Sequence, residues 1–324
     1  MSAEIERAVA ILRSGGLVAF PTETVYGLGA DASDDGAVAR VFAVKGRPAD
    51  HPLIVHLASA EQLDDWAAEV SDDARALTAA FWPGPLTLLV RRAASVGDGV
   101  TGGRPTVGLR VPDHPLALEL LEAFGGGIAA PSANRFGRVS PTTAEHVRAD
   151  LGDDVDLVLD GGPCRVGVES TIVDLSGDAP VVLRLGGITT DALADVLGRP
   201  VAVLDSAVPS DRGAKAPGML ESHYAPDARI VLVSAGEIDA VLRDLCVSVD
   251  GTIGVLAPDA LETVPDDVVE LEPAGPPEHY AQVLYDRLRQ ADRLGLAVLV
   301  CVPPAEFGLG RAVADRLRRA AAGR

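Results

Sequence analysis

The sequence predicts an α/β protein whose larger, N-terminal part is built on a mixed sheet. Short aliphatic and β-branched runs alternate with segments of helical periodicity, but several runs follow one another without a helix between them. The apolar fraction is 48% and aromatic residues make up only 4%, so the cores must consist of Val, Leu, Ile and Ala. Such cores are typical of parallel or mixed sheets covered by helices.

The first part of the chain alternates helices and strands. We expect a helix over 2–14, a strand over 17–20, a helix over 33–45 and a strand over 52–57. Ser2 is the expected N-cap of the first helix, and Ser59 with Gln62 suggests a capping box for a further short helix.

Six more apolar runs predict strands. They cover 85–90, 106–111, 127–130, 157–160, 170–175 and 180–185. Helical patterns separate only some of them, which favours a mixed sheet over a doubly wound one.

Periodicity stops near residue 204, and a stretch rich in Pro, Gly and Ala follows. The segment after it again alternates strands and helices, with a long helix over 278–294 and a last helix that ends at 321. We therefore divide the chain into a domain over 1–204, a linker or lid over 205–228 and a smaller α/β domain over 229–324.

Charge and composition limit the function. The chain has 28 Lys plus Arg against 47 Asp plus Glu, a net charge of -19, which disfavours extended binding to nucleic acid. No apolar run approaches a membrane span and the start lacks a signal peptide, so we expect a cytoplasmic protein without a membrane partner. The three cysteines form no CxxC pair, so we interpret them as small apolar residues.

Basic side chains gather locally against this acidic background. Only two residues are Lys, and Lys45 stands beside Arg47 in a segment that also contains His51 and His56. The two cations could simply satisfy the end of the preceding helix. Arg110 and Arg184 each interrupt an apolar strand, where a charge is costly without a partner or ligand.

Hydroxyl and amide side chains accompany these cations. PTETVYGLG follows a strand and could be an ordinary turn into a helix. Ser132 and Asn134 occupy alternate positions, which points them the same way if the backbone is extended. Ser140 before Pro141 could be an N-cap, and Ser170 begins a strand. There is no P-loop or GxGxxG motif, so side chains would have to hold any nucleotide. The whole set suits a polyanionic small molecule.

The ordered motifs PTETVYGLG, KGRP, PLIVH, FWPGPLTLL, GLRVPDHP, APSAN, SPT and GVESTIVD resemble the YrdC family. PGMLESHYAP and GRAVADRLRRA resemble its long, two-domain members, the threonylcarbamoyl-AMP synthases. The resemblance implies a YrdC-like catalytic domain with a twisted mixed sheet, joined to a smaller Rossmann-like α/β domain.

The implied reaction converts ATP, L-threonine and bicarbonate to L-threonylcarbamoyl-AMP, pyrophosphate and water. It is a nucleotidyltransferase reaction that supplies N6-threonylcarbamoyladenosine in tRNA, through a separate downstream tRNA threonylcarbamoyl transferase. Mg2+ is implied with ATP, held by phosphate oxygens and water, so we name no protein ligand for it. Because two anions must meet, the reaction requires positioning and concentrated positive charge.

The family pattern also implies roles for individual residues. Lys45 and Arg47 would be catalytic, and Arg110 would take the threonine carboxylate. The implied threonine site comprises Thr24, His56, Arg110, Ala130 through its backbone, and Ser170. The implied ATP site comprises Arg47, His51, Thr106, Ser132, Asn134, Ser140, Arg184 and Tyr224, the last closing over the nucleotide from the linker.

One residue departs from the family pattern, because Asn usually stands where this chain has His51. The sequence argues against two other functions and leaves one possibility open, that the second domain is a sensor for an unknown ligand. A carbamoyl-transfer maturation protein would need zinc-binding cysteine pairs and an acylphosphatase region, which the sequence lacks. A non-catalytic RNA-binding module would bind RNA with a steep salt dependence, against which the acidic charge argues.

Overall fold

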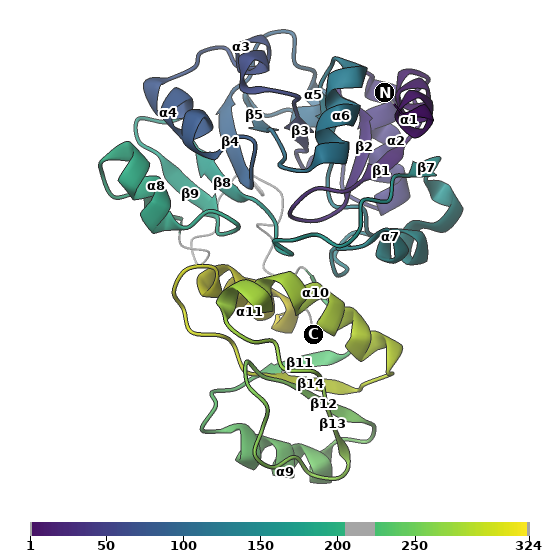
Figure 1. Cartoon of the computed structure of the whole chain (residues 1–324), viewed down its shortest axis with the longest axis vertical. Coiled ribbons are helices and arrows are strands. Elements are labelled where there is room, and N and C mark those ends of the chain that lie inside the picture. The colour runs from purple at the N-terminus through teal and green to yellow at the C-terminus, as the bar shows by residue number, and fades with distance from the viewer. Residues whose placement is uncertain (1, 205–223, 323–324) are drawn as a thin grey trace. The chain divides into compact units, whose positions relative to one another are not determined.

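The computed structural model describes residues 2–204 and 224–322, which form two compact units (Figure 1). The described N-terminal unit comprises residues 2–136, 140–165 and 169–204. The C-terminal unit comprises 224–322 and two short segments from earlier in the sequence, 137–139 and 166–168. The linker expected over 205–228 lies outside the described residues, apart from 224–228.

A mixed sheet of ten strands forms the described core of the N-terminal unit. It contains parallel pairs such as β3 with β5 and antiparallel pairs such as β4 with β5, which confirms the predicted mixed sheet. In spatial order the strands are β10 (Ala202–Val203), β9 (Val181–Arg184), β8 (Thr171–Asp174), β4 (Leu86–Arg91), β5 (Thr106–Arg110), β3 (Ile54–His56), β6 (Ile128–Ala129), β2 (Gly27–Asp31), β1 (Val18–Phe20) and β7 (Leu157–Val158).

Helices cover both faces of this sheet. Alternation along β1 shows the two faces, because Ala19 joins one apolar cluster while Val18 and Phe20 join another with residues of α1 and α6. The helical elements are α1 (Ala3–Arg13), α2 (Asp35–Lys45), η1 (Ala60–Gln62), α3 (Leu63–Trp66), α4 (Asp72–Phe81), α5 (Asp98–Thr101), α6 (Pro115–Phe124), α7 (Ala144–Leu151), η2 (Gly152–Asp154) and α8 (Thr190–Leu197).

The C-terminal unit has a four-stranded parallel sheet with helices on both sides (Figure 1). Its strands in spatial order are β11 (Arg229–Leu232), β14 (Val298–Cys301), β12 (Ile253–Leu256) and β13 (Val268–Glu270). Its helices are α9 (Ile238–Ser248), α10 (Pro277–Arg293) and α11 (Gly310–Ala321). The predicted alternation of strands and helices is confirmed here.

Capping confirms one local prediction and corrects two others. The Ser2 side chain caps α1 by accepting a hydrogen bond from the backbone N–H of Ile5. The Ser59 side chain makes no cap hydrogen bond, and the Gln62 side chain accepts from the N–H of Ala58 and not from that of Ser59, so the capping box is wrong. Ser140 is not an N-cap either, as Thr143 caps α7.

The turn after β1 and one cysteine also differ from expectation. PTETVYGLG connects β1 to an antiparallel strand, β2, and not to a helix. Cys164 and Cys301 are buried as expected, but Cys246 is exposed in the last turn of α9. No helix of the described chain combines the length and apolar character that a bilayer crossing needs.

Candidate active site

Lys45 ends helix α2 and is 3% exposed. Its ammonium group donates hydrogen bonds to the carbonyl oxygens of Ser132 and Asn134, each at 2.6 Å. The helix-end role considered for Lys45 is therefore wrong, because its partners lie in a distant loop. Burial, followed by the nearby Arg47 guanidinium, holds the pKa of Lys45 well below its usual range.

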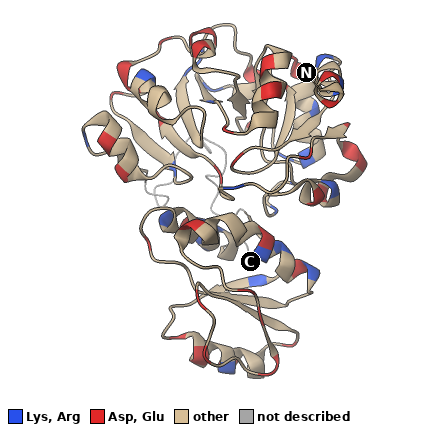
Figure 2. Cartoon of the chain, viewed as in Figure 1, with Lys and Arg blue, Asp and Glu red and all other residues tan. Residues whose placement is uncertain are grey.

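Arg47 and His51 gather around the ring of Phe136. Gly46, at φ 64°, ends α2 in the left-handed conformation and redirects the chain. The Arg47 guanidinium donates to the Pro52 carbonyl at 3.0 Å and lies 5.8 Å from the Phe136 ring centroid. The His51 ring meets Phe136 edge-on at 5.5 Å, and burial and Arg47 lower the pKa of His51. Arg47 and Lys45 are thus neighbouring cations in a chain that is acidic overall, and Figure 2 shows where basic and acidic residues lie along the ribbon.

Ser132 and Asn134 are brought beside Lys45, although not by an extended strand. Asn134 N–H donates to the Ser132 carbonyl at 3.0 Å, so the backbone turns here. The condition for the predicted common direction of the two side chains is therefore not met. The Phe136 N–H donates to the Lys45 carbonyl at 2.8 Å, which closes this loop onto the end of α2.

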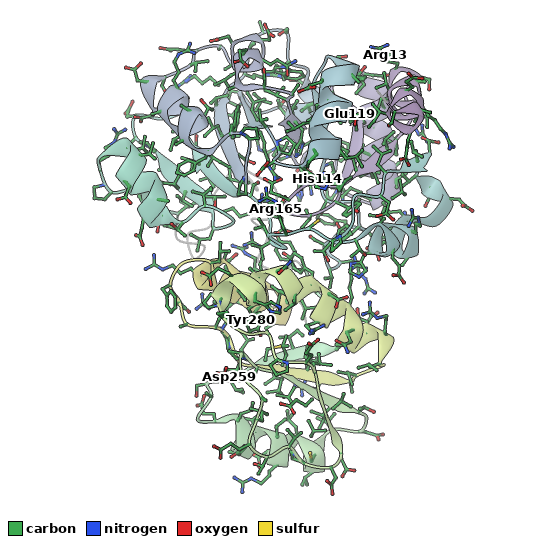
Figure 3. The ribbon with its side chains drawn as sticks, viewed as in Figure 1. Arg13, His114, Glu119, Arg165, Asp259 and Tyr280 are labelled. Atoms are coloured by element: carbon green, nitrogen blue, oxygen red, sulfur yellow. The ribbon has the colours of Figure 1, made fainter. Side chains whose placement is uncertain are left out.

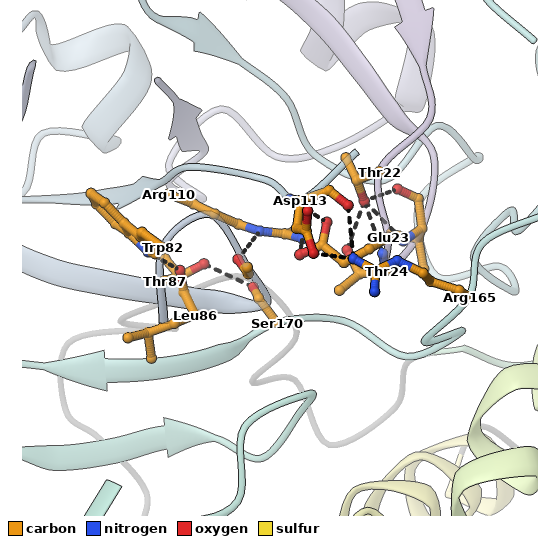
Figure 4. A network of polar contacts seen from close by, with 12 residues as sticks. Thr22, Glu23, Thr24, Trp82, Leu86, Thr87, Arg110, Asp113, Arg165 and Ser170 are labelled. Atoms are coloured by element: carbon orange, nitrogen blue, oxygen red, sulfur yellow. Dashed lines mark hydrogen bonds and ion pairs between the residues drawn. The ribbon is translucent and has the colours of Figure 1, made fainter. Parts of the chain in front are cut away.

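Arg110 meets a buried carboxylate at the end of β5. Its Nη2 lies 2.7 Å from Oε1 of Glu23, and the two side chains are 5% and 0% exposed. Nε of Arg110 donates to the Gly84 carbonyl at 3.3 Å. The other Glu23 oxygen accepts from the N–H of Asp113 at 3.1 Å. Figure 4 shows these contacts. The charge predicted to need a partner therefore has one.

A second layer of polar residues surrounds Glu23. The Asp113 carboxylate pairs with the Arg165 guanidinium. His114, labelled with Arg165 in Figure 3, begins α6, and burial lowers the pKa of its imidazole. Of these residues Asp113 contacts Glu23, through its backbone N–H, and none belongs to the implied sites.

Three residues of the implied threonine site lie on neighbouring strands or turns. The Thr24 and Thr22 hydroxyl oxygens are 2.8 Å apart, one residue from Glu23. His56 is paired with Arg110 in the parallel register of β3 and β5. Ala130 donates its N–H to the Ile54 carbonyl at 2.9 Å.

His56 is a neutral group at neutral pH. It is 3% exposed, and its ring meets Phe20 edge-on at 5.8 Å. Burial, together with the Arg110 cation, lowers the pKa of His56 to about 3. It can therefore offer a ligand a hydrogen bond but no charge.

Ser170 links the implied threonine and ATP sites. Its hydroxyl lies 2.8 Å from that of Thr87 and accepts a hydrogen bond from Arg184 Nη2 at 3.0 Å (Figure 4 shows the Thr87 contact). Arg184 Nε also donates to the Ser170 carbonyl at 3.0 Å. Arg184 was predicted to need a partner or a ligand, and the Ser170 carbonyl and hydroxyl are such partners.

Ser140 joins this second group. It is fully buried, and its hydroxyl donates to Oε1 of Glu169 at 2.7 Å. The Ser140 hydroxyl thus contacts a carboxylate, and the side chain that caps α7 is that of Thr143. Glu169 is adjacent to Ser170 in sequence, so Ser140 lies on the Ser170 side of the unit.

Thr106 lies at the opposite end of β5 from Arg110. Ile54 is aligned with Gly108 in the register, which places the start of β5 beside the Pro52 region that Arg47 contacts. Thr106 therefore lies at the end of β5 that is beside Pro52, the residue that Arg47 contacts, and not at the Arg110 end.

Tyr224 lies within the C-terminal unit. Its side chain is 1% exposed, stacked on Tyr285 with centroids 5.6 Å apart, and Arg316 lies over its ring at 5.2 Å. Its backbone has φ 63°, which is rare for a residue with a side chain. The structure does not bring Tyr224 together with the rest of the implied ATP site in one unit.

Sequence reasoning missed four residues of this region. Glu23, Thr87 and Glu169 contact predicted site residues, and Phe136 packs against two of them. Glu23 and Glu169 stand inside quoted motifs, so an acidic residue in a buried, hydroxyl-rich motif was the available signal. Within residues 2–204 and 224–322, no cluster of three His, Cys, Asp or Glu side chains is suited to hold a metal.

Two protein families match the chain in succession. The family described as "Telomere recombination" (Sua5_yciO_yrdC) matches residues 10–186, and "Threonylcarbamoyl-AMP synthase, C-terminal domain" matches residues 188–322. The threonylcarbamoyl-AMP synthases of Pyrococcus abyssi and Bacillus subtilis are 44% and 41% identical to the chain. The first alignment covers 98% of this chain and 94% of the relative, and the second covers 99% and 94%.

A solved structure agrees with the sequence relatives. The crystal structure of P. abyssi Sua5 complexed with L-threonine superposes with a TM-score of 0.92 at 42% identity, covering 99% of this chain and 94% of that one. The chain belongs to the Sua5, YciO and YrdC family, among its long threonylcarbamoyl-AMP synthases.

Proposed function

We propose that the protein is an L-threonylcarbamoyl-AMP synthase, a nucleotidyltransferase that uses ATP, L-threonine and bicarbonate. The observation that carries the proposal is the cluster of Lys45, Arg47, Ser132 and Asn134, assembled from the C-terminal end of α2 and a loop far from it in sequence, in a chain of net charge -19. Relatives that align over 94% of their own length carry this activity in their names.

The chemistry has two steps. The threonine amine and bicarbonate give a carbamate and water. A carbamate oxygen then attacks the α-phosphorus of ATP, the bond to the bridging oxygen breaks, and pyrophosphate leaves. Both reactants are anions in the second step, so local positive charge lowers the barrier.

Lys45 and Arg47 provide that charge. An ammonium group has three donors, and two of those of Lys45 hold the carbonyls of Ser132 and Asn134. Its position is thereby fixed before the nucleotide binds, as electrostatic catalysis requires. Arg47 is likewise held between the Pro52 carbonyl and the Phe136 ring.

We propose that ATP contacts Arg47, His51, Thr106, Ser132, Asn134, Ser140, Arg184 and Tyr224, and that threonine contacts Thr24, His56, Arg110, Ala130 and Ser170. The Ser170–Arg184 contact supports adjacent sites, because each residue is assigned to a different substrate. Mg2+ would enter with ATP and be held by phosphate oxygens and water. The product would pass to a tRNA threonylcarbamoyl transferase in the cytoplasm.

Pyrophosphate release tests the proposal. Purified protein with ATP, Mg2+, L-threonine and bicarbonate should release pyrophosphate, and omission of threonine or bicarbonate should abolish the release. Release that is independent of either substrate would contradict the proposed reaction.

A further inference from the structure

Two buried atoms of opposite charge in the N-terminal unit lack hydrogen-bond partners. They are Oε1 of Glu23 and Nη2 of Arg110, and no residue of the described chain completes either one. They lie 2.7 Å apart as an ion pair, but the direction of the N–H bonds does not make it a hydrogen bond. A buried anion thus lacks a donor beside a buried cation that lacks an acceptor.

One further atom of each group has a hydrogen-bond partner. The second Glu23 oxygen accepts from Asp113 N–H, and Nε of Arg110 donates to the Gly84 carbonyl. These contacts hold the carboxylate and the guanidinium beside each other, with Nη2 of Arg110 2.7 Å from Oε1 of Glu23 (Figure 4). A buried polar atom is normally hydrogen-bonded, so the carboxylate oxygen calls for a donor and the guanidinium nitrogen for an acceptor.

A purely structural role explains this pair poorly. Burying two ions costs several kcal/mol for each, which their attraction offsets only with good hydrogen-bond geometry. Here the geometry between them is incomplete. A ligand that carries both an anion and a cation on neighbouring atoms would complete both groups at once.

We propose that Glu23 binds the α-ammonium group of the amino-acid substrate, beside Arg110, which binds its carboxylate. The inference rests on the proposed function. Threonine is a zwitterion at neutral pH, and the Glu23–Arg110 pair presents the complementary charges. The site would therefore select an α-amino acid over a carboxylate without the amine.

The test compares two ligands, L-threonine and (R)-3-hydroxybutanoate, which is threonine without its amine. Both are titrated by NMR into the full-length wild type and Glu23→Gln. The substitution keeps the shape and an oxygen for Asp113 N–H, but removes the charge. We expect it to weaken threonine on the order of 10- to 100-fold, the usual worth of a hydrogen bond to a charged group, and to leave the desamino ligand within about threefold.

Glu169→Gln is the matched control, because Glu169 is also a buried carboxylate but contacts Ser140. It should preserve the ratio of the two affinities. If Glu23→Gln does not fold, Glu23→Asp is tested in its place. It keeps the negative charge but shortens the side chain by one methylene, which moves the carboxylate away from the ligand's ammonium group. A fall of threefold or more in the preference for threonine then supports the inference.

Equal weakening of both ligands, or no change in their ratio in the variant that folds, would overturn the ammonium site. Failure of the wild type to bind threonine at all would overturn it together with the proposed function. Pyrophosphate release by the wild type separates these two results.

Discussion

Removing the charge of Lys45 should abolish most turnover while the protein stays folded. Lys45→Met eliminates two hydrogen bonds of 2.6 Å from a charged donor, which contribute about 1.5 to 3 kcal/mol each. The same change removes the cost of burying an ammonium group, several kcal/mol in the opposite direction. The two contributions largely cancel, so we expect the free energy of unfolding to change by no more than about 2 kcal/mol.

The catalytic loss should be larger. One positioned electrostatic contact contributes about 3 to 4 kcal/mol to the barrier, or roughly 100- to 1000-fold in kcat. Lys45→Gln separates charge from shape, because its amide can still donate to one carbonyl. If charge is the cause, both variants lose turnover to a similar extent. Rates come from pyrophosphate release, and folding from thermal melts.

Arg135→Met is the matched control. Arg135 is also a cation near Lys45, but its side chain is 46% exposed and pairs with Asp154. Its removal should change kcat less than about fivefold, because solvent screens an exposed charge. Turnover of Lys45→Gln within threefold of wild type would refute the argument from charge.

Three further predictions concern single side chains. The pKa of His56 is about 3 in the folded protein, so below about pH 6.5 the unfolded chain binds one proton more than the folded chain. The free energy of unfolding should therefore fall by about 2 kcal/mol between pH 6.5 and 5. Denaturant titrations of His56→Gln should lack this loss. His51→Asn introduces the residue that is usual in the family and removes one ring contact with Phe136 worth about 0.5 to 1.5 kcal/mol, so the KM for ATP should change less than about tenfold at pH 7. A larger rise would show that the proposed contact of position 51 with ATP requires the imidazole. Tyr224→Ala removes the ring that stacks on Tyr285 and should destabilise the C-terminal unit by about 3 to 5 kcal/mol, whereas Tyr224→Phe keeps the ring and should destabilise it far less. Equal melting temperatures for the two variants would disprove the importance of this stacking.

Most of the sheet could be predicted because its strands are continuous aliphatic runs. β3, β5, β8 and β9 fall within expected segments, and β4 extends one residue beyond the expected 85–90. β2 was missed, since Gly27–Asp31 contains two glycines and no β-branched residue. Its strand character depends on pairing with β1 and β6, which a local pattern does not contain.

The site was predictable in part for a similar reason. Arg110 and Arg184 can be recognised as site candidates from the sequence. A charged residue inside an apolar strand is expected to be buried, and burying a charge costs free energy unless it has a partner. The partners of these two arginines cannot be recognised in this way, since Glu23 and Ser170 lie on distant segments that only the fold brings near. Lys45 shows the limit most clearly, because its partners are the backbone carbonyls of Ser132 and Asn134, and every residue has a carbonyl.

The short segments 137–139 and 166–168 make the C-terminal unit discontinuous in sequence. Within that unit, Arg138 pairs with Asp227, and Ala225 N–H donates to the Gly137 carbonyl. A gene split after residue 204 would therefore place Gly137 and Arg138 on one fragment and their partners Ala225 and Asp227 on the other. Reassociation of the separately expressed halves through these contacts is the behaviour that this interleaving of the chain implies.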